Sequence, residues 1–209
     1  MSAACDGNRP RSGDQPAEAF GRSYELQGAT KLAAPASVTF GLRDILAPNL
    51  RVVFCGINPG LTSAVRGHHF AGRGNRFWKT IHLAGFTRNE IVPEQDESIL
   101  AEGCGLTTAV PRPTSRADEL SRDEFERASS GLSAKIAYYS PAYVAFLGKS
   151  AFSVIFGKRF VSWGRQDDLL GGSKTWVLPN PSGLNRAFRL DQLVRAYTEL
   201  RLALDGASK

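Results

Sequence analysis

The fold is decided by a short apolar stretch, Arg51-Val52-Val53-Phe54-Cys55-Gly56-Ile57, which runs directly into Asn58-Pro59-Gly60. Its apolar, largely β-branched run does not alternate with polar residues, which is typical of a strand covered on both faces of a sheet. Tyr143–Leu147 and Thr175–Leu178 are two further strands of this kind, and Leu106-Thr107 predicts a short additional one. The chain is therefore expected to form a buried, mostly parallel sheet.

Helical patterns separate these strands. Residues 75–84 place Phe77, Trp78, Ile81 and Ala84 on one face, and 149–156 predicts a second helix. Ser121 with Glu124 matches a capping box, and the helix that follows is expected to stop before Pro141. A last helix begins at Asp191. Strands alternating with helices predict an α/β fold, a three-layer α/β/α sandwich around a short, mostly parallel sheet of four to five strands.

Composition limits the function classes. The 209 residues are 42% hydrophobic, which suffices for a sizeable core, and no run approaches the roughly 18 apolar residues of a membrane helix. Residues 1–36 are rich in Gly, Pro, Ala and Ser with balanced charges, so we expect a disordered tail before a single domain over 37–209. Three cysteines without a CxxC pair, and no signal peptide, favour a reducing, cytoplasmic location.

Two predicted strands end in conspicuous loops. The first leads into Gly56–Gly60 and the third into Pro179–Leu184. Because ligands bind outside the carboxyl ends of strands in such sheets, we expect both loops at one edge, where they form the site.

Positive charge accompanies these loops. The net charge is +6, and the stretches between Asp44 and Glu90 and between Asp168 and Asp191 contain no acid. Their bases are Arg51, Arg66, Arg73, Arg76, Lys79 and Arg88 in the first stretch, and Lys174, Arg186 and Arg189 in the second. Such stretches suit a phosphate backbone, although an ordinary solvated surface is the alternative.

Several motifs stand in order along the chain: Gly56-Ile57-Asn58-Pro59-Gly60-Leu61, Phe70-Ala71, Asn75-Arg76-Phe77-Trp78-Lys79, Arg112-Pro113-Thr114, Leu147-Gly148-Lys149 and Asn180-Pro181-Ser182-Gly183-Leu184. Over about residues 38–204 the chain resembles the mismatch-specific uracil-DNA glycosylases, the bacterial branch that includes the thymine-DNA glycosylases. The resemblance implies a uracil-DNA glycosylase-like fold and hydrolysis of the N-glycosidic bond of a uracil or mismatched base, flipped out of double-stranded DNA, especially opposite guanine. It implies base-excision repair by a nucleoid-associated monomer without a cofactor. No metal site is expected, because the three histidines, of which His68 and His69 are adjacent, show no metal-ligand spacing such as HxxxH.

The resemblance also implies roles in a base pocket. Asn58 would orient the attacking water, because an amide has no useful basicity; a simple turn is the alternative for Asn58-Pro59-Gly60. Phe70 would stack on the base, or else belong to the core. The remaining pocket residues are Ile57, whose backbone would read the uracil edge, Gly60, which would allow close backbone approach, Ser63, which would crowd a thymine methyl, and Asn75, which would order the pocket or cap a helix.

The last motif resembles the segment that enters the duplex. Leu184 would fill the space of the expelled base, unless it is a buried leucine, and Gly183 and Arg186 would contact the opposite base. Asn185 stands where a smaller polar residue is common, which leaves the partner-strand preference open. The remaining DNA contacts are expected from Asn180, Ser182 and Lys149.

Other polar residues depart from the pattern. Thr108 stands where some relatives have lysine, so that charge is absent. Asp118 or Glu119 could supply a base, but acids before a helix N-terminus explain them better. His68 and His69 are expected in a solvated loop, with a phosphate contact from His69 as the alternative.

Two other functions stay open. A protein with this fold could bind damaged DNA or abasic sites without catalysis. A nucleotide-binding α/β protein would use the glycine-rich stretch as a phosphate cradle, but neither GxGxxG nor GxxxxGK[ST] occurs between Gly56 and Gly74.

Overall fold

The computed structural model describes residues 42–206. Its strands are β1 (Val52–Gly56), β2 (Cys104–Thr108), β3 (Tyr143–Leu147), β4 (Gly164–Leu170) and β5 (Ser173–Leu178). Its helices are α1 (Leu61–Arg66), α2 (Phe77–Leu83), α3 (Arg122–Tyr139), α4 (Lys149–Ile155) and α5 (Leu190–Gly206), with 3-10 segments η1 (Pro93–Glu102) and η2 (Ala117–Glu119). The expected tail, residues 1–36, and the expected start of the domain at residue 37 lie outside the described residues.

The sheet has five strands in the order β2-β1-β3-β5-β4. β1, β2, β3 and β5 are parallel, and β4 pairs antiparallel with β5 at one edge. The predicted α/β fold, with a short and mostly parallel sheet, is therefore confirmed. The three central strands β1, β3 and β5 are buried almost throughout, as their continuous apolar runs require.

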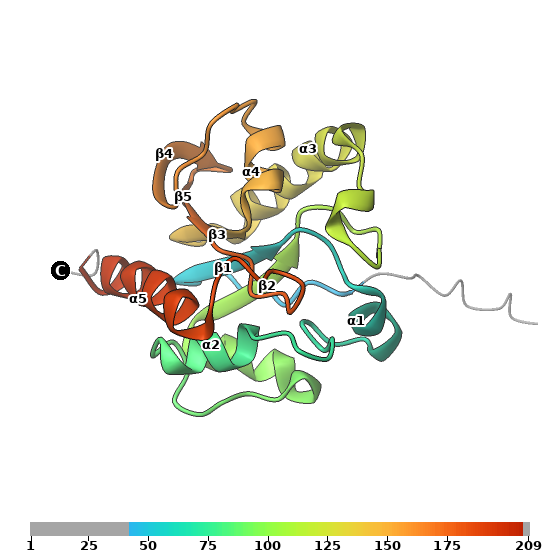
Figure 1. The fold of residues 1–209 in the computed structure, drawn as a ribbon. Helices are drawn as coiled ribbons and strands as arrows, with labels where there is room; N and C mark the ends of the chain where they lie inside the picture. The colour runs from blue at the N-terminus through green and yellow to red at the C-terminus, as the bar shows by residue number, and fades with distance from the viewer. Residues whose placement is uncertain (1–41, 207–209) are drawn as a thin grey trace, which may run out of the picture. The chain divides into compact units, whose positions relative to one another are not determined.

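Two hydrophobic cores lie on opposite faces of this sheet, because successive side chains of a strand point to opposite sides. On one face Val52 and Phe54 pack with residues of α2, η1 and α5. On the other, Val53 and Cys55 pack with residues of α3 and α4. Figure 1 shows this sandwich, with α2 and α5 on one side of the strands and α3 and α4 on the other.

Helix boundaries follow local chemistry. The Ser121 hydroxyl accepts a hydrogen bond from the Glu124 amide, and the Glu124 carboxylate accepts one from the Ser121 amide, so the predicted capping box is confirmed. α3 ends at Ser140 as predicted, but for a different reason. Ser140 is left-handed (φ 48°, ψ 50°), and its amide donates to the Ile136 carbonyl, so a left-handed C-cap ends the helix directly before Pro141.

Several elements were not predicted. β4 is polar and half-exposed, α1 has only six residues, η1 is interrupted by a kink at Gln95, and η2 has only three residues. β2 is also longer than the predicted pair Leu106-Thr107, since it begins at Cys104. None of these changes the order of the strands that form the site.

Candidate functional site

The loops that follow β1 and β5 line one cavity of about 960 Å³. Residues 69–76 and 114–117 complete its wall. The predicted site residues that line it are Ile57, Asn58, Gly60, Ser63, Phe70, Asn75, Asn180, Ser182, Gly183, Leu184, Asn185 and Arg186. The structure thus brings together every predicted site residue except Lys149.

The loop after β1 is held along the segment that follows β2. The amides of Ala109 and Val110 donate to the carbonyls of Gly56 and Ile57, at 2.8 and 3.0 Å. The Thr114 amide donates to the Pro59 carbonyl at 3.1 Å. Backbone hydrogen bonds between the two segments therefore continue beyond β1 and β2 and fix the backbone on either side of Asn58.

Hydrogen bonds fix the orientation of the Asn58 side chain. Its Nδ2 donates to the Arg112 carbonyl at 2.8 Å and to the Thr114 hydroxyl at 2.7 Å. A carbonyl can only accept, and the single hydroxyl proton of Thr114 is donated to the Arg116 carbonyl at 2.7 Å. Both partners therefore require the NH₂ end of the amide, which rules out the flipped assignment.

This orientation leaves Asn58 Oδ1 as an acceptor. No other residue between 42 and 206 donates a hydrogen bond to it. Because Asn58 lines the cavity, Oδ1 can accept a hydrogen bond from a water or ligand bound there, although an amide is too weakly basic to remove the proton. The turn-forming and water-orienting interpretations of Asn58 are thus compatible.

Phe70 is supported from one side by the core. Its ring stacks on that of the fully buried Phe77, with centroids 3.9 Å apart. Its backbone is left-handed (φ 56°), which is uncommon for a bulky residue. Next to it, the Ala71 amide donates to Ser63 Oγ at 3.0 Å, and the His69 amide donates to Asp96 Oδ2 at 2.8 Å. A half-buried aromatic ring is thereby fixed at the cavity wall.

The other pocket candidates have distinct environments. Ser63 is buried, and its hydroxyl oxygen holds the segment at Ala71 in place. A Cβ at Gly60 would meet no atom within 4 Å, so packing inside the protein does not require glycine there. Asn75 Oδ1 accepts from the Phe77 amide at 2.9 Å, just before α2, while the residue also lines the cavity.

The loop after β5 is ordered largely by its own side chains. Asn180 Oδ1 accepts from the Ser182 amide at 2.9 Å, and Ser182 Oγ accepts from the Leu184 amide at 3.3 Å. Asn185 Nδ2 donates to the Asn180 carbonyl, and its Oδ1 accepts from the Ala187 amide. The Asn185 side chain is therefore engaged within the loop. Leu184, at the tip, is 73% exposed and is not a buried leucine.

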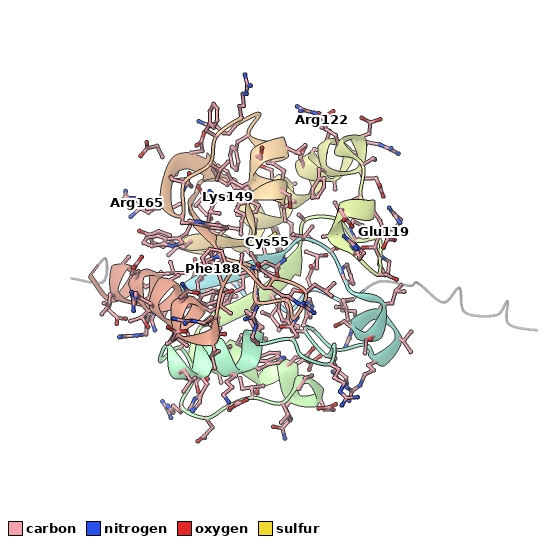
Figure 2. The ribbon with its side chains drawn as sticks, viewed as in Figure 1. Cys55, Glu119, Arg122, Lys149, Arg165 and Phe188 are labelled. Carbon is pink, nitrogen blue, oxygen red and sulfur yellow. The ribbon has the colours of Figure 1, made fainter. Side chains whose placement is uncertain are left out.

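Lys149 is the predicted site residue outside the cavity lining. Its Nζ lies 4.4 Å from the centroid of the Trp163 ring, whose edge meets Phe188 at a centroid distance of 5.3 Å. Lys149 and Phe188 are labelled in Figure 2. Since Phe188 lines the cavity, two aromatic rings, Trp163 and Phe188, connect Lys149 to it.

The described cavity lining contains five arginines and no Asp or Glu; the arginines are Arg73, Arg76, Arg116, Arg186 and Arg189. The expected positive stretch is, however, partly neutralised in three dimensions. Arg51 forms an ion pair with Asp205, and Arg66 forms one with Glu94. Absence of acids along the sequence did not mean their absence in space.

Asp118 and Glu119 lie in η2, outside the cavity lining. Arg116 donates to Asp118 through Nε and Nη2, at 3.1 and 2.6 Å, and this pairing lowers the pKa of the Asp118 carboxyl. Glu119, at the periphery in Figure 2, accepts from the Arg116 amide. These contacts favour the helix-terminus interpretation over a catalytic base.

His69 is not in a solvated loop, contrary to expectation. It is 2% exposed, and its Nε2 lies 2.9 Å from the Arg43 carbonyl, to which it donates in the neutral form. Burial lowers the pKa of this imidazole. A phosphate contact through Nε2 would require this hydrogen bond to break.

Two residues of the site were missed from the sequence. Thr114 and Arg76 stand in motifs, but the partners of their side chains come from distant segments that no local pattern reveals.

Among residues 42–206, no group of three or more His, Cys, Asp or Glu side chains is arranged to hold a metal ion. Within the same range, no helix is long and apolar enough to span a membrane.

Two comparisons relate the chain to known proteins. The family model described as the uracil DNA glycosylase superfamily matches residues 43–201. The fold is similar to the solution NMR structure of a candidate uracil DNA glycosylase from Methanosarcina acetivorans, with a TM-score of 0.54 and 20% sequence identity. That match covers 79% of this chain and 97% of the other. The similarity extends over almost the whole described region.

Proposed function

Since the chain belongs to the uracil DNA glycosylase superfamily, we propose that it is a monofunctional glycosylase that removes uracil from double-stranded DNA, especially opposite guanine. One observation supports this most strongly: Asn58, Phe70 and Leu184 line the same cavity although they come from three separate segments. An amide acceptor, an aromatic platform and an exposed apolar side chain are the parts needed to hold and replace a flipped base.

In the proposed reaction the uracil nucleotide leaves the stack and its base lies beside Phe70. The bond between C1′ and N1 breaks, and its electron pair leaves with the base as a uracil anion. Water held by Asn58 Oδ1 bonds to C1′ and loses its proton to solvent. Because no carboxylate is present in the described lining, the rate depends on positioning the water and stabilising the anion. The product is an abasic site in an uncut strand.

Discrimination at the base is proposed to involve Ser63. It is buried at the cavity wall, and its Cβ and hydroxyl are held in place by the Ala71 amide. A thymine methyl near it would be crowded, so uracil is the expected substrate over thymine. One methyl group accounts for only about 1–3 kcal/mol of such discrimination.

The experiment is a single-turnover assay of free uracil from a U·G duplex, with T·G, U·A and single-stranded uracil as comparisons. We expect release without added metal or nucleotide. Asn58→Ala should abolish release while duplex binding changes little, because the amide acts on the water and not on the DNA backbone. If no free uracil appears with excess wild-type enzyme, the proposed function is wrong. Binding without release would then favour a non-catalytic binder of damaged DNA.

A further inference from the structure

We infer that Arg76 is a positioning residue that holds the loop of residues 179–189 in the conformation from which Leu184 enters the duplex. This inference rests on the proposed function and adds a residue to it. The sequence places Arg76 among basic residues expected to face phosphate, whereas in the structure its guanidinium binds backbone carbonyls.

The guanidinium of Arg76 is directed at backbone oxygens of this loop. Nη1 donates to the Phe188 carbonyl at 2.6 Å, and Nη2 donates to the carbonyls of Ser182 and Asn185 at 2.9 and 2.8 Å. Nε donates to the Pro181 carbonyl at 3.3 Å, which also accepts from the Arg76 amide at 3.0 Å. Four loop carbonyls are thus gathered around one side chain.

This arrangement requires arginine. The planar guanidinium presents five donors in a fixed fork, so it can reach acceptors in several directions at once, whereas an ammonium group is a compact point charge. None of the ion pairs between residues 42 and 206 includes Arg76, so its charge is matched by carbonyl dipoles. A carboxylate partner does not compete for it within this region.

Two further contacts hold the same loop. A Cβ at Gly183 would lie 2.7 Å from the Gly74 carbonyl oxygen, so the backbones of the two segments touch where only glycine fits. The hydroxyl of the buried Tyr197 donates to the Pro179 carbonyl at 3.2 Å. In Figure 1 the chain between β5 and α5 passes beside α2, at whose start Arg76 lies.

Contacts with the rest of the protein therefore hold the loop in place, while the Leu184 side chain at its tip is exposed. Leu184 is 73% exposed, and its backbone amide bonds only within the loop, to Ser182. An apolar side chain on a pre-ordered loop enters a duplex with less loss of conformational entropy than one on a loose loop. Arg76 supplies this pre-ordering through its four carbonyl partners in the loop.

The test is a double-mutant cycle on uracil release from a U·G duplex, using wild type, Arg76→Lys, Leu184→Ala and the double variant. Arg76→Lys keeps the charge but cannot bind four carbonyls, so release should fall about 10- to 100-fold. If Arg76 acts through Leu184, the double variant should release uracil as slowly as Leu184→Ala alone. Arg195→Lys, at an exposed position of α5 outside the cavity, is the matched control and should match wild type.

Three results would overturn the inference: an unchanged rate in Arg76→Lys, an unchanged rate in Leu184→Ala, or effects that multiply in the double variant. Amide hydrogen exchange gives a readout that does not need activity. Exchange should rise at residues 182–189 in Arg76→Lys while the sheet amides stay protected. If Arg76→Lys does not fold, Gly183→Ala disturbs the same packing without altering charge and takes its place in the cycle.

Failure of the two proposals can be told apart. Wild-type enzyme that releases no uracil contradicts the proposed function, and hydrogen exchange still tests what Arg76 holds. Wild-type enzyme that releases uracil, with Arg76→Lys behaving like Arg195→Lys in both measurements, contradicts the positioning role alone.

Discussion

At the scale of single residues, a short series of hydrogen bonds determines which end of the Asn58 amide is available for chemistry. The Arg116 carbonyl takes the Thr114 proton, Thr114 then accepts from Asn58 Nδ2, and Oδ1 is left over. Thr114 is 3% exposed, so water does not readily replace it. The direction of the Asn58 amide therefore depends on the Thr114 hydroxyl.

Thr114→Val tests this dependence. Valine has the same shape but cannot accept from Asn58, so the amide loses one of its two fixed partners. We expect the single-turnover rate of uracil release to fall about tenfold, since one such bond contributes about 1–1.5 kcal/mol. Thr114→Ser, the control, keeps the hydroxyl and should stay near wild type. Equal rates for valine and serine would show that Thr114 does not orient the amide.

A second residue-scale prediction concerns acid. The pKa of His69 lies below its ordinary value of 6.5 because burial penalises the charged ring. The unfolded chain therefore binds a proton more readily, and the stability contributed by neutral His69 is present above pH 6.5 and lost as the pH falls through the folded pKa. Urea unfolding at about pH 7.5 and pH 5.5 should show a smaller loss for His69→Gln than for wild type. An equal loss in both proteins would contradict this.

The location of a site residue was predictable where it stands in a loop that follows a strand. Asn58 and Leu184 lie in polar, glycine-containing loops of this kind, and both line the cavity, whereas the roles proposed for them rest on the family resemblance. The loop contacts of Arg76 were not predictable, because the carbonyls that its side chain binds lie more than 100 residues away in sequence. The prediction that His69 is solvated was wrong for a related reason. Its neighbours in sequence are typical of an exposed loop, and only its contacts with the distant Arg43 and Asp96 explain its burial.

At the scale of elements, the hairpin of β4 and β5 forms the edge of the sheet next to α3. Gly171 and Gly172 turn the chain with φ of 53° and 88°. A Cβ at Gly171 would lie 2.6 Å from the Ala137 nitrogen and the Ser133 carbonyl oxygen, so the turn packs directly on the helix backbone. The hairpin thereby fixes the start of β5, whose other end leads to the site.

Gly171→Ala should therefore destabilise the protein by about 2 kcal/mol or more, from left-handed strain and overpacking together. Gly131→Ala is the control: Gly131 lies exposed within α3, where a Cβ meets nothing within 4 Å. It should stabilise by about 0.5–1 kcal/mol. Urea unfolding measures both changes, and a stable Gly171→Ala variant would contradict the described packing.

The same hairpin shows which kind of strand cannot be identified from apolar runs in the sequence. β1, β3 and β5 are buried on both faces, so their apolar runs identify them. β4 is a polar edge strand whose exposure alternates, and its sequence resembles a loop. Gly171-Gly172 before the predicted strand Thr175–Leu178 was the available signal, since two glycines are typical of a two-residue hairpin turn.

At the scale of the whole molecule, parallel strands bring two distant loops to one edge of the sheet. β3 lies between β1 and β5, so the loops after β1 and β5 stand on either side of it and line one cavity. The first presents the Asn58 amide, and the second presents Leu184 at an exposed tip. We propose that chemistry and base extrusion are divided between these loops.

This division predicts that the two steps can be separated by mutation. The most direct measurement is stopped-flow fluorescence of 2-aminopurine placed next to uracil in a U·G duplex, with free uracil quantified over the same time course. Wild type should show unstacking followed by release, Asn58→Ala unstacking without release, and Leu184→Ala little of either. Loss of unstacking in Asn58→Ala, or wild-type behaviour of Leu184→Ala, would contradict the account.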